Sequence, residues 1–307
     1  MKYYITLILL PLFSIVFGCS SSAEVIEMNS SKISYKTTID YSPTLISQTL
    51  PSIVEEQSGM IWWKGLIWVI NDSGNNPCLY AYDKSGELKQ TVTVANAENI
   101  DWESLADDDT YLYIGDFGNN EGNRKDLKIL RIKKSLISED DAKVNAEFIY
   151  FSWADQTDYT GEQELHNYDC EAFFAYKGLL YLFSKDLEDS KTRIYTVSNK
   201  PGTYSLSPIT TIDTQFSVTG ADISPDGKTI ALVGYQNLVN SYLFFIYNLD
   251  QMNWKSAKTV RIHLTSLFAA QTEGIVFDDN NQLFVTTEKT FLASPSLYQI
   301  NWTKFLQ

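Results

Sequence analysis

Five short segments decide the fold, and each places an oxygen-bearing side chain at the start of an apolar run: Ser58-Gly59-Met60, Glu103-Ser104-Leu105, Glu171-Ala172-Phe173, Thr219-Gly220-Ala221 and Glu273-Gly274-Ile275. A second apolar run and then a polar loop follow each opening. Repeats of about 50 residues made of short strands are typical of propeller blades. The sequence therefore predicts an all-β chain, folded as a five-bladed β-propeller of four-stranded antiparallel blades.

The first unit shows the blade pattern most clearly. Its apolar runs cover residues 58–63, 66–71, 78–83 and 88–94, with the turn-forming sequence Asp83-Lys84-Ser85-Gly86 between the last two. The fifth unit has only three runs, and residues 45–50 are well placed to supply its outer strand and close the ring. Six blades remain the alternative, if residues 30–50 and an insertion at 154–168 form a further unit.

The start of the chain is typical of an exported protein. Lys2 precedes an apolar stretch at residues 3–17 that is short for a membrane span. Val16-Phe17-Gly18-Cys19 resembles the lipobox of bacterial lipoproteins. The resemblance implies a signal peptide at residues 1–18 and a lipidated Cys19 that anchors the protein to a membrane. The polar stretch that follows predicts a tether at residues 19–40, and the repeat predicts a single propeller domain at 41–307. We therefore expect an extracytoplasmic protein of the cell envelope, at the outer membrane. An ordinary secretory cleavage site is the alternative.

Composition narrows the choice of partners. The 307 residues are 44% hydrophobic and 20% charged, with a formal net charge of −14. This charge argues against nucleic acid and anionic lipid headgroups as partners and is compatible with a divalent cation. Apart from Cys19, the only cysteines are Cys78 and Cys170, in different blades. A bridge between them stays open but is not favoured, and we expect a monomer.

In a propeller the first strand of each blade lines the central channel, so the five openings should converge on the axis. Hard oxygen ligands with three carboxylates suit Ca²⁺. The predicted metal ligands are Ser58, Glu103, Glu171, Thr219 and Glu273. Glu56, Asp101 and Asp222 could replace or assist a member of this ring. The alternative is that the ring side chains cap backbone N–H groups at strand starts.

A second ring is expected from the loops that follow the second strands. The candidate ligand-binding residues there are Asn71, Asp72, Asp116, Lys185, Tyr235 and Glu288. If the protein is an enzyme, Asp72 or Asp116 would position a water molecule and Lys185 would hold the substrate. The alternative is that Asn-Asp-Ser-Gly and similar stretches merely form turns. We expect His166, in the insertion, to be solvated.

The ring series resembles that of the calcium-activated nucleotidase (apyrase) family, five-bladed propellers that hold an axial calcium with a Ser, Glu, Glu, Ser, Glu series. Gln271-Thr272-Glu273-Gly274-Ile275 is similar to the final-blade motif of that family. The resemblance implies the fold and the calcium. The chain departs from the family's phosphate-gripping groups, with Asn71 and Ser73 in the first-blade loop and Lys185-Asp186 in place of an arginine pair. Nucleotide hydrolysis is therefore only weakly implied.

Several segments also resemble those of uncharacterised exported propeller proteins. They cover residues 56–59, 71–74, 101–103, 115–119 and 219–227. Our leading hypothesis is a lipid-anchored extracytoplasmic propeller with an axial Ca²⁺ site, which binds a small ligand or partner on its acidic top face. This face is the one formed by the loops that enter each first strand and the loops that join each second strand to the third. The alternatives are a calcium-dependent hydrolase of phosphoanhydrides or esters, and a non-enzymatic envelope scaffold.

Overall fold

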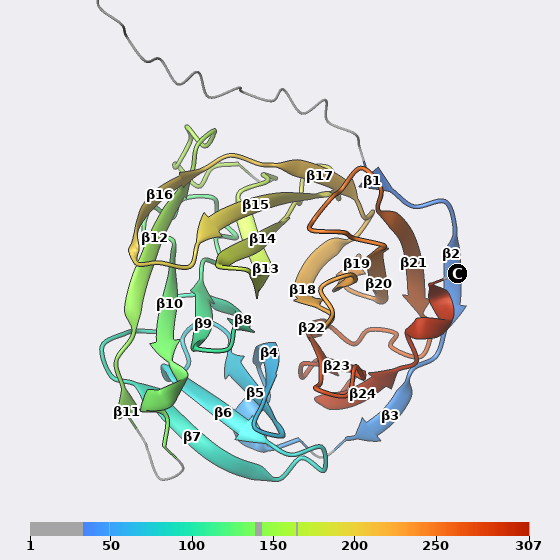
Figure 1. Cartoon of the computed structure of the whole chain (residues 1–307), viewed down its shortest axis with the longest axis horizontal. Coiled ribbons are helices and arrows are strands. Elements are labelled where there is room, and N and C mark those ends of the chain that lie inside the picture. The colour runs from blue at the N-terminus through green and yellow to red at the C-terminus, as the bar shows by residue number, and fades with distance from the viewer. Residues whose placement is uncertain (1–32, 49, 139–142, 164, 307) are drawn as a thin grey trace, which may run out of the picture.

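A computed structural model describes residues 33–48, 50–138, 143–163 and 165–306. Within these residues, five sheets surround a central axis like the blades of a propeller (Figure 1). This arrangement confirms the prediction of an all-β, five-bladed propeller, and no sixth blade occurs in the described part of the chain. The signal peptide and Cys19 predicted for the chain start lie outside the described residues.

Each blade has four strands that follow one another from the axis outward. The first two blades contain β4 (Gln57–Trp63), β5 (Leu66–Asn71), β6 (Cys78–Tyr82) and β7 (Leu88–Val94), then β8 (Trp102–Asp107), β9 (Tyr111–Asp116), β10 (Lys128–Lys133) and β12 (Glu147–Trp153). The third and fourth contain β13 (Asp169–Tyr176), β14 (Leu179–Lys185), β15 (Thr192–Ser198) and β17 (Thr210–Asp213), then β18 (Ser217–Ile223), β19 (Ile230–Gln236), β20 (Asn240–Tyr247) and β21 (Lys258–Leu264).

The ring closes in the fifth blade, as predicted. This blade consists of β22 (Thr272–Phe277), β23 (Leu283–Thr287) and β24 (Ser296–Ile300), and its outer strand is β3 (Thr44–Ser47) from the start of the chain. β3 runs antiparallel to β24. An early segment of the chain is therefore built into the last blade. Three short 3₁₀ helices complete the described structure: η1 (Ser52–Val54), η2 (Lys134–Leu136) and η3 (Thr303–Phe305).

Four blades carry a fifth strand, which the prediction of four-stranded blades did not include. These strands run parallel to the outer edges of blades one to four and are β11 (Lys143–Val144), β16 (Gly202–Leu206), β1 (Ile33–Ser34) and β2 (Thr38–Tyr41). β11 and β16 each lie in the sequence of one blade and pair with the preceding blade. β1 and most of β2 fall within residues 19–40, the segment expected to be a tether, and they pair with the outer edges of blades three and four.

The core lies between neighbouring blades. Inner strands such as β5 are almost wholly buried because a blade covers each face, whereas the outer strand β12 alternates between buried and exposed residues. At the closing interface, Val69 and Tyr82 of blade one share a cluster with Phe284 and Leu297 of blade five. Fully burying a large apolar side chain contributes about 1.5–3 kcal/mol. These contacts therefore hold the two ends of the ring together.

Every innermost strand has a β-bulge where it pairs with the second strand. The residues that the bulges leave without a partner are Gly59, Glu103, Glu171, Thr219 and Glu273. Bulges redirect side chains and are frequent beside functional sites. Four of the five predicted ring residues thus occupy one equivalent position. In blade one that position is Gly59, with φ of +53°, where a Cβ atom would lie 2.4 Å from the backbone nitrogen of Leu105. Ser58 therefore precedes the bulge position.

Candidate metal and ligand site on the propeller axis

A polar cavity of about 190 Å³ lies where the innermost strands begin and the second strands end. It is lined by Ser58, Asp72, Glu103, Asn120, Glu171, Lys185, Tyr235, Gln271, Glu273 and Glu288. The two predicted rings therefore meet in one space, which we call the axial cavity. Sequence reasoning missed Asn120 and Gln271. Asn120 directly follows the segment 115–119, and Gln271 is the first residue of the quoted motif Gln271-Thr272-Glu273-Gly274-Ile275, so the available signal was their place in or beside these motifs.

Two ring hydroxyls hold neighbouring blades together. The Ser58 hydroxyl donates a hydrogen bond to the carbonyl of Glu103 in the next blade. The Thr219 hydroxyl donates to the carbonyl of Thr272 at 2.5 Å, and Thr219 is fully buried and does not line the axial cavity. Both hydroxyls thus bond to backbone oxygens, whereas the three glutamates of the ring all line the cavity.

Asp116 and Asn71 also lie outside the lining of the axial cavity. The buried Asp116 carboxylate accepts a hydrogen bond from Arg124 Nη2 at 2.9 Å, and Lys128 Nζ lies 2.8 Å from its other oxygen. This arrangement fixes the loop after β9. Asn71 donates through Nδ2 to the carbonyl of Ile53 at 2.7 Å. Of the six predicted ligand-binding residues, the structure brings Asp72, Lys185, Tyr235 and Glu288 into the cavity.

Burial and crowding perturb the carboxylic acids of the cavity. Burial, and then repulsion from Glu171, raises the pKa of both Glu103 and Glu273 well above the usual range. Burial also raises the pKa of Glu171 to about 8 and that of Glu288 to about 7. Several of these groups therefore hold protons near neutral pH, unless a positive charge enters.

Lys185 supplies one positive charge within the cavity. Its ammonium forms an ion pair with the Glu171 carboxylate and lies 5.8 Å from the centre of the Tyr235 ring. Burial alone would lower the pKa of Lys185, but the attraction of Glu171 and other acids raises it well above the usual value. The lysine is therefore charged. It faces five carboxylic acids, those of Asp72, Glu103, Glu171, Glu273 and Glu288.

The tightest group of oxygen ligands lies at the edge of the cavity. Carboxylate oxygens of Asp72, Asp101 and Glu103 lie within 4.8 Å of one another. Gly118 makes this convergence possible, because a Cβ atom there would lie 2.3 Å from Glu103 Oε1 and 2.4 Å from Asp101 Oδ2. Burial, followed by repulsion from Asp72, raises the pKa of Asp101 to about 6. An all-oxygen donor set of this kind fits a hard cation such as Ca²⁺.

Asp169 adds a further buried acid that the sequence analysis did not identify. Its Oδ1 accepts the backbone N–H of Asn119 at 2.7 Å, while its buried Oδ2 has no hydrogen-bond partner among the described residues. The charge of Asp169 contributes to the raised pKa of Asp101 and of Glu103. An unpartnered buried carboxylate oxygen costs free energy unless a positive charge compensates it. This oxygen also favours a cation near the axis.

Comparisons with known proteins match this chain to solved structures alone. Neither the protein-family models nor the curated proteins contain a match. Among solved structures, the mannose phosphorylase MPT-4 from Leishmania mexicana, in complex with phosphate ion, has 12% identity and a TM-score of 0.48, covering 88% of this chain and 91% of its own. A glucose dehydrogenase and the soluble aldose sugar dehydrogenase (Asd) from Escherichia coli each have 8% identity and a TM-score of 0.47, covering 80% of this chain and 96% of theirs.

Two further expectations concern the cysteines and the insertion. Cys78 and Cys170 are both buried and free. The expectation that His166 is solvated was wrong, because the residue is 2% exposed and its ring nitrogens contact the Asn120 carbonyl and the Tyr168 backbone N–H.

No helix in the described part of the chain has the length and apolar character that a membrane crossing needs.

Proposed function

We propose that this protein is a calcium-dependent binding protein of the cell envelope, with a Ca²⁺ ion at the acidic end of its axis and a ligand or partner on the surrounding top face. The observation that carries the proposal is the convergence of five carboxylic acids on one small cavity, opposed by a single ammonium. Asp72, Asp101 and Glu103 would hold the ion through carboxylate oxygens. The buried acids would lose their protons as it binds.

The top face also has an apolar rim, which supports binding of a partner. Leu238, Phe268, Phe291 and Leu292 are exposed, and they belong to loops that open at the same end as the axial cavity. Two hydrogen bonds connect these loops: Ala269 N donates to Val239 O at 2.8 Å, and the Thr290 hydroxyl donates to Ala269 O at 3.1 Å. Clustered exposed apolar side chains with polar surroundings are typical of interaction surfaces. The rim favours a partner protein or an amphipathic ligand.

Membrane anchoring through Cys19 completes the proposal. It rests on the sequence Val16-Phe17-Gly18-Cys19 and would keep the propeller near a membrane surface. Mass spectrometry of the mature protein checks it, because a diacylated and N-acylated Cys19 at the amino terminus has a mass that ordinary secretory cleavage cannot give. An unmodified terminus would remove the anchor from the proposal and leave the calcium site untouched.

Hydrolysis is less well supported than binding. Asp116 is held by Arg124 and Lys128 outside the cavity, and the Lys185 ammonium is engaged by Glu171. Of the three residues considered for catalysis, Asp72 alone lines the cavity without an ion pair to another residue that the structure describes. Burial raises its pKa. Calcium-dependent phosphate release from nucleoside diphosphates, lost in Asp72→Ala, would support a hydrolase instead.

The decisive experiment is a calorimetric calcium titration of a soluble form beginning at Ala23, performed in two buffers with different ionisation enthalpies. We expect one saturable site, proton release on binding and a higher melting temperature with calcium. Glu103→Gln should weaken binding by tenfold or more, about 1.4 kcal/mol. The matched control is Glu147→Gln, because Glu147 lies on the outer strand β12 and pairs with Arg131. Equal binding by both variants, or no binding by the native protein, would refute the axial site.

A further inference from the structure

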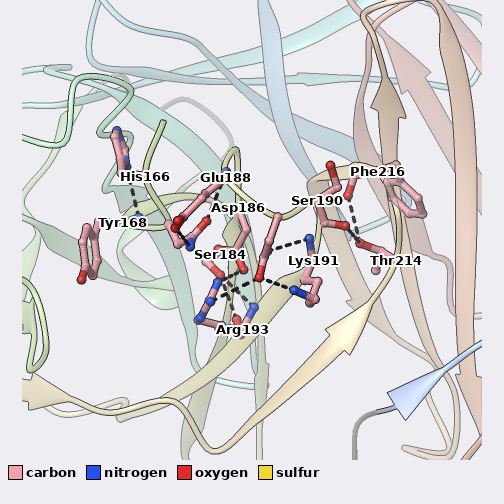
Figure 2. Close-up of polar contacts among 12 residues, drawn as sticks. His166, Tyr168, Ser184, Asp186, Glu188, Ser190, Lys191, Arg193, Thr214 and Phe216 are labelled. Atoms are coloured by element: carbon pink, nitrogen blue, oxygen red, sulfur yellow. Dashed lines mark hydrogen bonds and ion pairs between the residues drawn. The ribbon is translucent and has the colours of Figure 1, made fainter. Parts of the chain in front are cut away.

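A second polar cavity, of about 310 Å³, lies away from the axis, between the insertion that precedes β13 and the loop from β14 to β15. We call it the lateral cavity. The residues that matter here are Asp155, Asn167, Tyr168, Glu188, Arg193 and Tyr195. Figure 2 shows part of this region, with His166 and Tyr168 on one side of Arg193 and Asp186, and Thr214 and Phe216 on the other. None of these residues belongs to the axial cavity.

The Tyr195 hydroxyl is the feature that points to a ligand. Tyr195 is fully buried, yet among the described residues its hydroxyl has no hydrogen-bond partner. The ring is fixed against Trp153, with ring centres 4.4 Å apart, and Trp153 Nε1 donates to the Tyr168 carbonyl at 2.9 Å. Leaving a buried hydroxyl unpaired costs about 1–3 kcal/mol. A group held rigidly in this way is preorganised to bond to something that enters the cavity.

The charges of the lateral cavity indicate the kind of ligand. The Arg193 guanidinium already forms ion pairs with Asp186 and with Asp189, the latter at 3.5 Å. Asp155 and Glu188 are exposed acids that line the cavity together with the half-buried Asp158, and Asn167 Nδ2 donates to Glu188 at 2.7 Å. Three carboxylates, those of Asp155, Asp158 and Glu188, repel an anion, and a neutralised arginine gives an anion little compensation. The Arg193 guanidinium has donors only and is positively charged, so it does not suit a cation.

A neutral molecule with several hydroxyl groups can bond to both the acceptors and the donors of the cavity. Each hydroxyl can donate to a carboxylate and accept from Tyr195 or Arg193. Tyr168 also lines this cavity, and an aromatic ring can pack against the C–H groups of such a molecule. A cavity of this volume is in the range that small-molecule sites occupy. We propose that the lateral cavity binds a neutral polyhydroxylated ring, one pyranose unit of a carbohydrate, through Tyr195, Arg193, Asp155 and Glu188.

The test is a titration of the soluble chain with methyl α-glycosides of glucose, mannose and galactose, followed by calorimetry and saturation-transfer NMR. EGTA is present throughout, which makes the outcome independent of the proposed calcium site. At least one glycoside should bind, whereas inorganic phosphate and ethanolamine should not. Tyr195→Phe should weaken that binding by about tenfold, the effect of one lost hydrogen bond. Its melting temperature without glycoside should be equal or higher, because the deleted hydroxyl has no protein partner.

Tyr204→Phe is the matched control. The Tyr204 hydroxyl donates to the Lys200 carbonyl at 3.0 Å, away from the lateral cavity, so its removal should leave glycoside binding unchanged. Glu188→Gln, at an exposed position, should weaken binding several-fold without affecting folding. The proposal is overturned if no glycoside binds, if phosphate or ethanolamine binds instead, or if Tyr195→Phe binds as tightly as the native protein. A lower melting temperature of Tyr195→Phe would also overturn it, because the hydroxyl would then have a partner already.

Discussion

The ammonium of Lys185 and the carboxylate of Glu171 form an ion pair inside the axial cavity, where both side chains are buried. The lysine thus occupies the region in which a metal ion would gain most from the surrounding acids. A bound cation and the Lys185 ammonium would repel each other, so the lysine would lower the affinity of the proposed calcium site. It also keeps Glu171 from being an uncompensated buried charge in the absence of metal.

Replacing Lys185 with methionine should therefore raise calcium affinity by about tenfold or more, equivalent to 1.4 kcal/mol. Without calcium, the same variant should be less stable at pH 8 than at pH 5, because Glu171 can then be neutral only by keeping its proton. Calorimetry and thermal unfolding measure the two effects. Lys191→Met is the control, since Lys191 pairs with Asp189 outside the cavity. A decrease in calcium affinity in Lys185→Met would show that the ammonium assists the site.

The calcium-free protein should lose stability as the pH rises from about 5 to about 8. Burial raises the pKa of Asp101 to about 6, that of Glu288 to about 7 and that of Glu171 to about 8. Between the unfolded and folded pKa values the folded protein binds more protons, so each group contributes a loss of up to about 1.4 kcal/mol per pH unit.

Bound calcium should reduce the dependence of stability on pH, because it favours the ionised carboxylates. Melting temperatures measured every half pH unit, with calcium and with EGTA, provide the comparison. Glu171→Gln should reduce the slope in EGTA. A calcium-free melting temperature that stays constant or increases between pH 5 and pH 8 would contradict the raised pKa values.

Gly118→Ala should impair calcium binding through geometry alone. The new methyl group would overlap Glu103 Oε1 and Asp101 Oδ2, so both carboxylates would have to move. We expect a loss of 10-fold to 100-fold in affinity, the range typical of disturbed ligand positioning. Gly178→Ala is the control, because a Cβ atom there meets nothing within 4 Å, although its φ of +81° makes alanine costly. Both variants should lose stability, but only Gly118→Ala should lose affinity.

The closing interface should be sensitive to cavity formation. Phe284 is 1% exposed and packs against Trp62 across the junction of blades five and one, with ring centres 6.5 Å apart. Phe284→Ala should lower the free energy of unfolding by about 3–5 kcal/mol. Phe291→Ala removes the same atoms from an exposed loop and should change stability by less than about 0.5 kcal/mol. Chemical denaturation compares them directly, and equal effects would mean that the junction contributes little.

The five blades could be predicted because their inner strands are long apolar runs that open with a repeated pattern. The repeated pattern in the sequence corresponds to the bulges, because Glu103, Glu171 and Glu273 all occupy the bulge position of their blades. The fifth strands could not be predicted. β1 and β11 have two residues each, and pairing with a neighbouring edge, rather than any periodicity of their own, makes them strands.

The candidate site was predicted in part, for a similar reason. The acids of the axial cavity follow from strand position, which the repeat supplies. The exclusion of Asp116 does not, because it depends on ion pairs with Arg124 and Lys128 that only the folded loop brings together. The burial of His166 likewise depends on the carbonyl of Asn120, which is distant in sequence.

Two strands, β11 and β16, pair with the blade that precedes their own in the sequence, and this limits how the chain can be divided or permuted. Because β11 and β16 join the sheet before their own, no cut between the first three blades yields contiguous modules that keep all of their strands. A duplicated or excised unit would have an unpaired outer edge, which is prone to aggregation. Permuted forms of this protein should therefore tolerate new termini within a loop that joins the second and third strands of one blade better than at the borders between repeats.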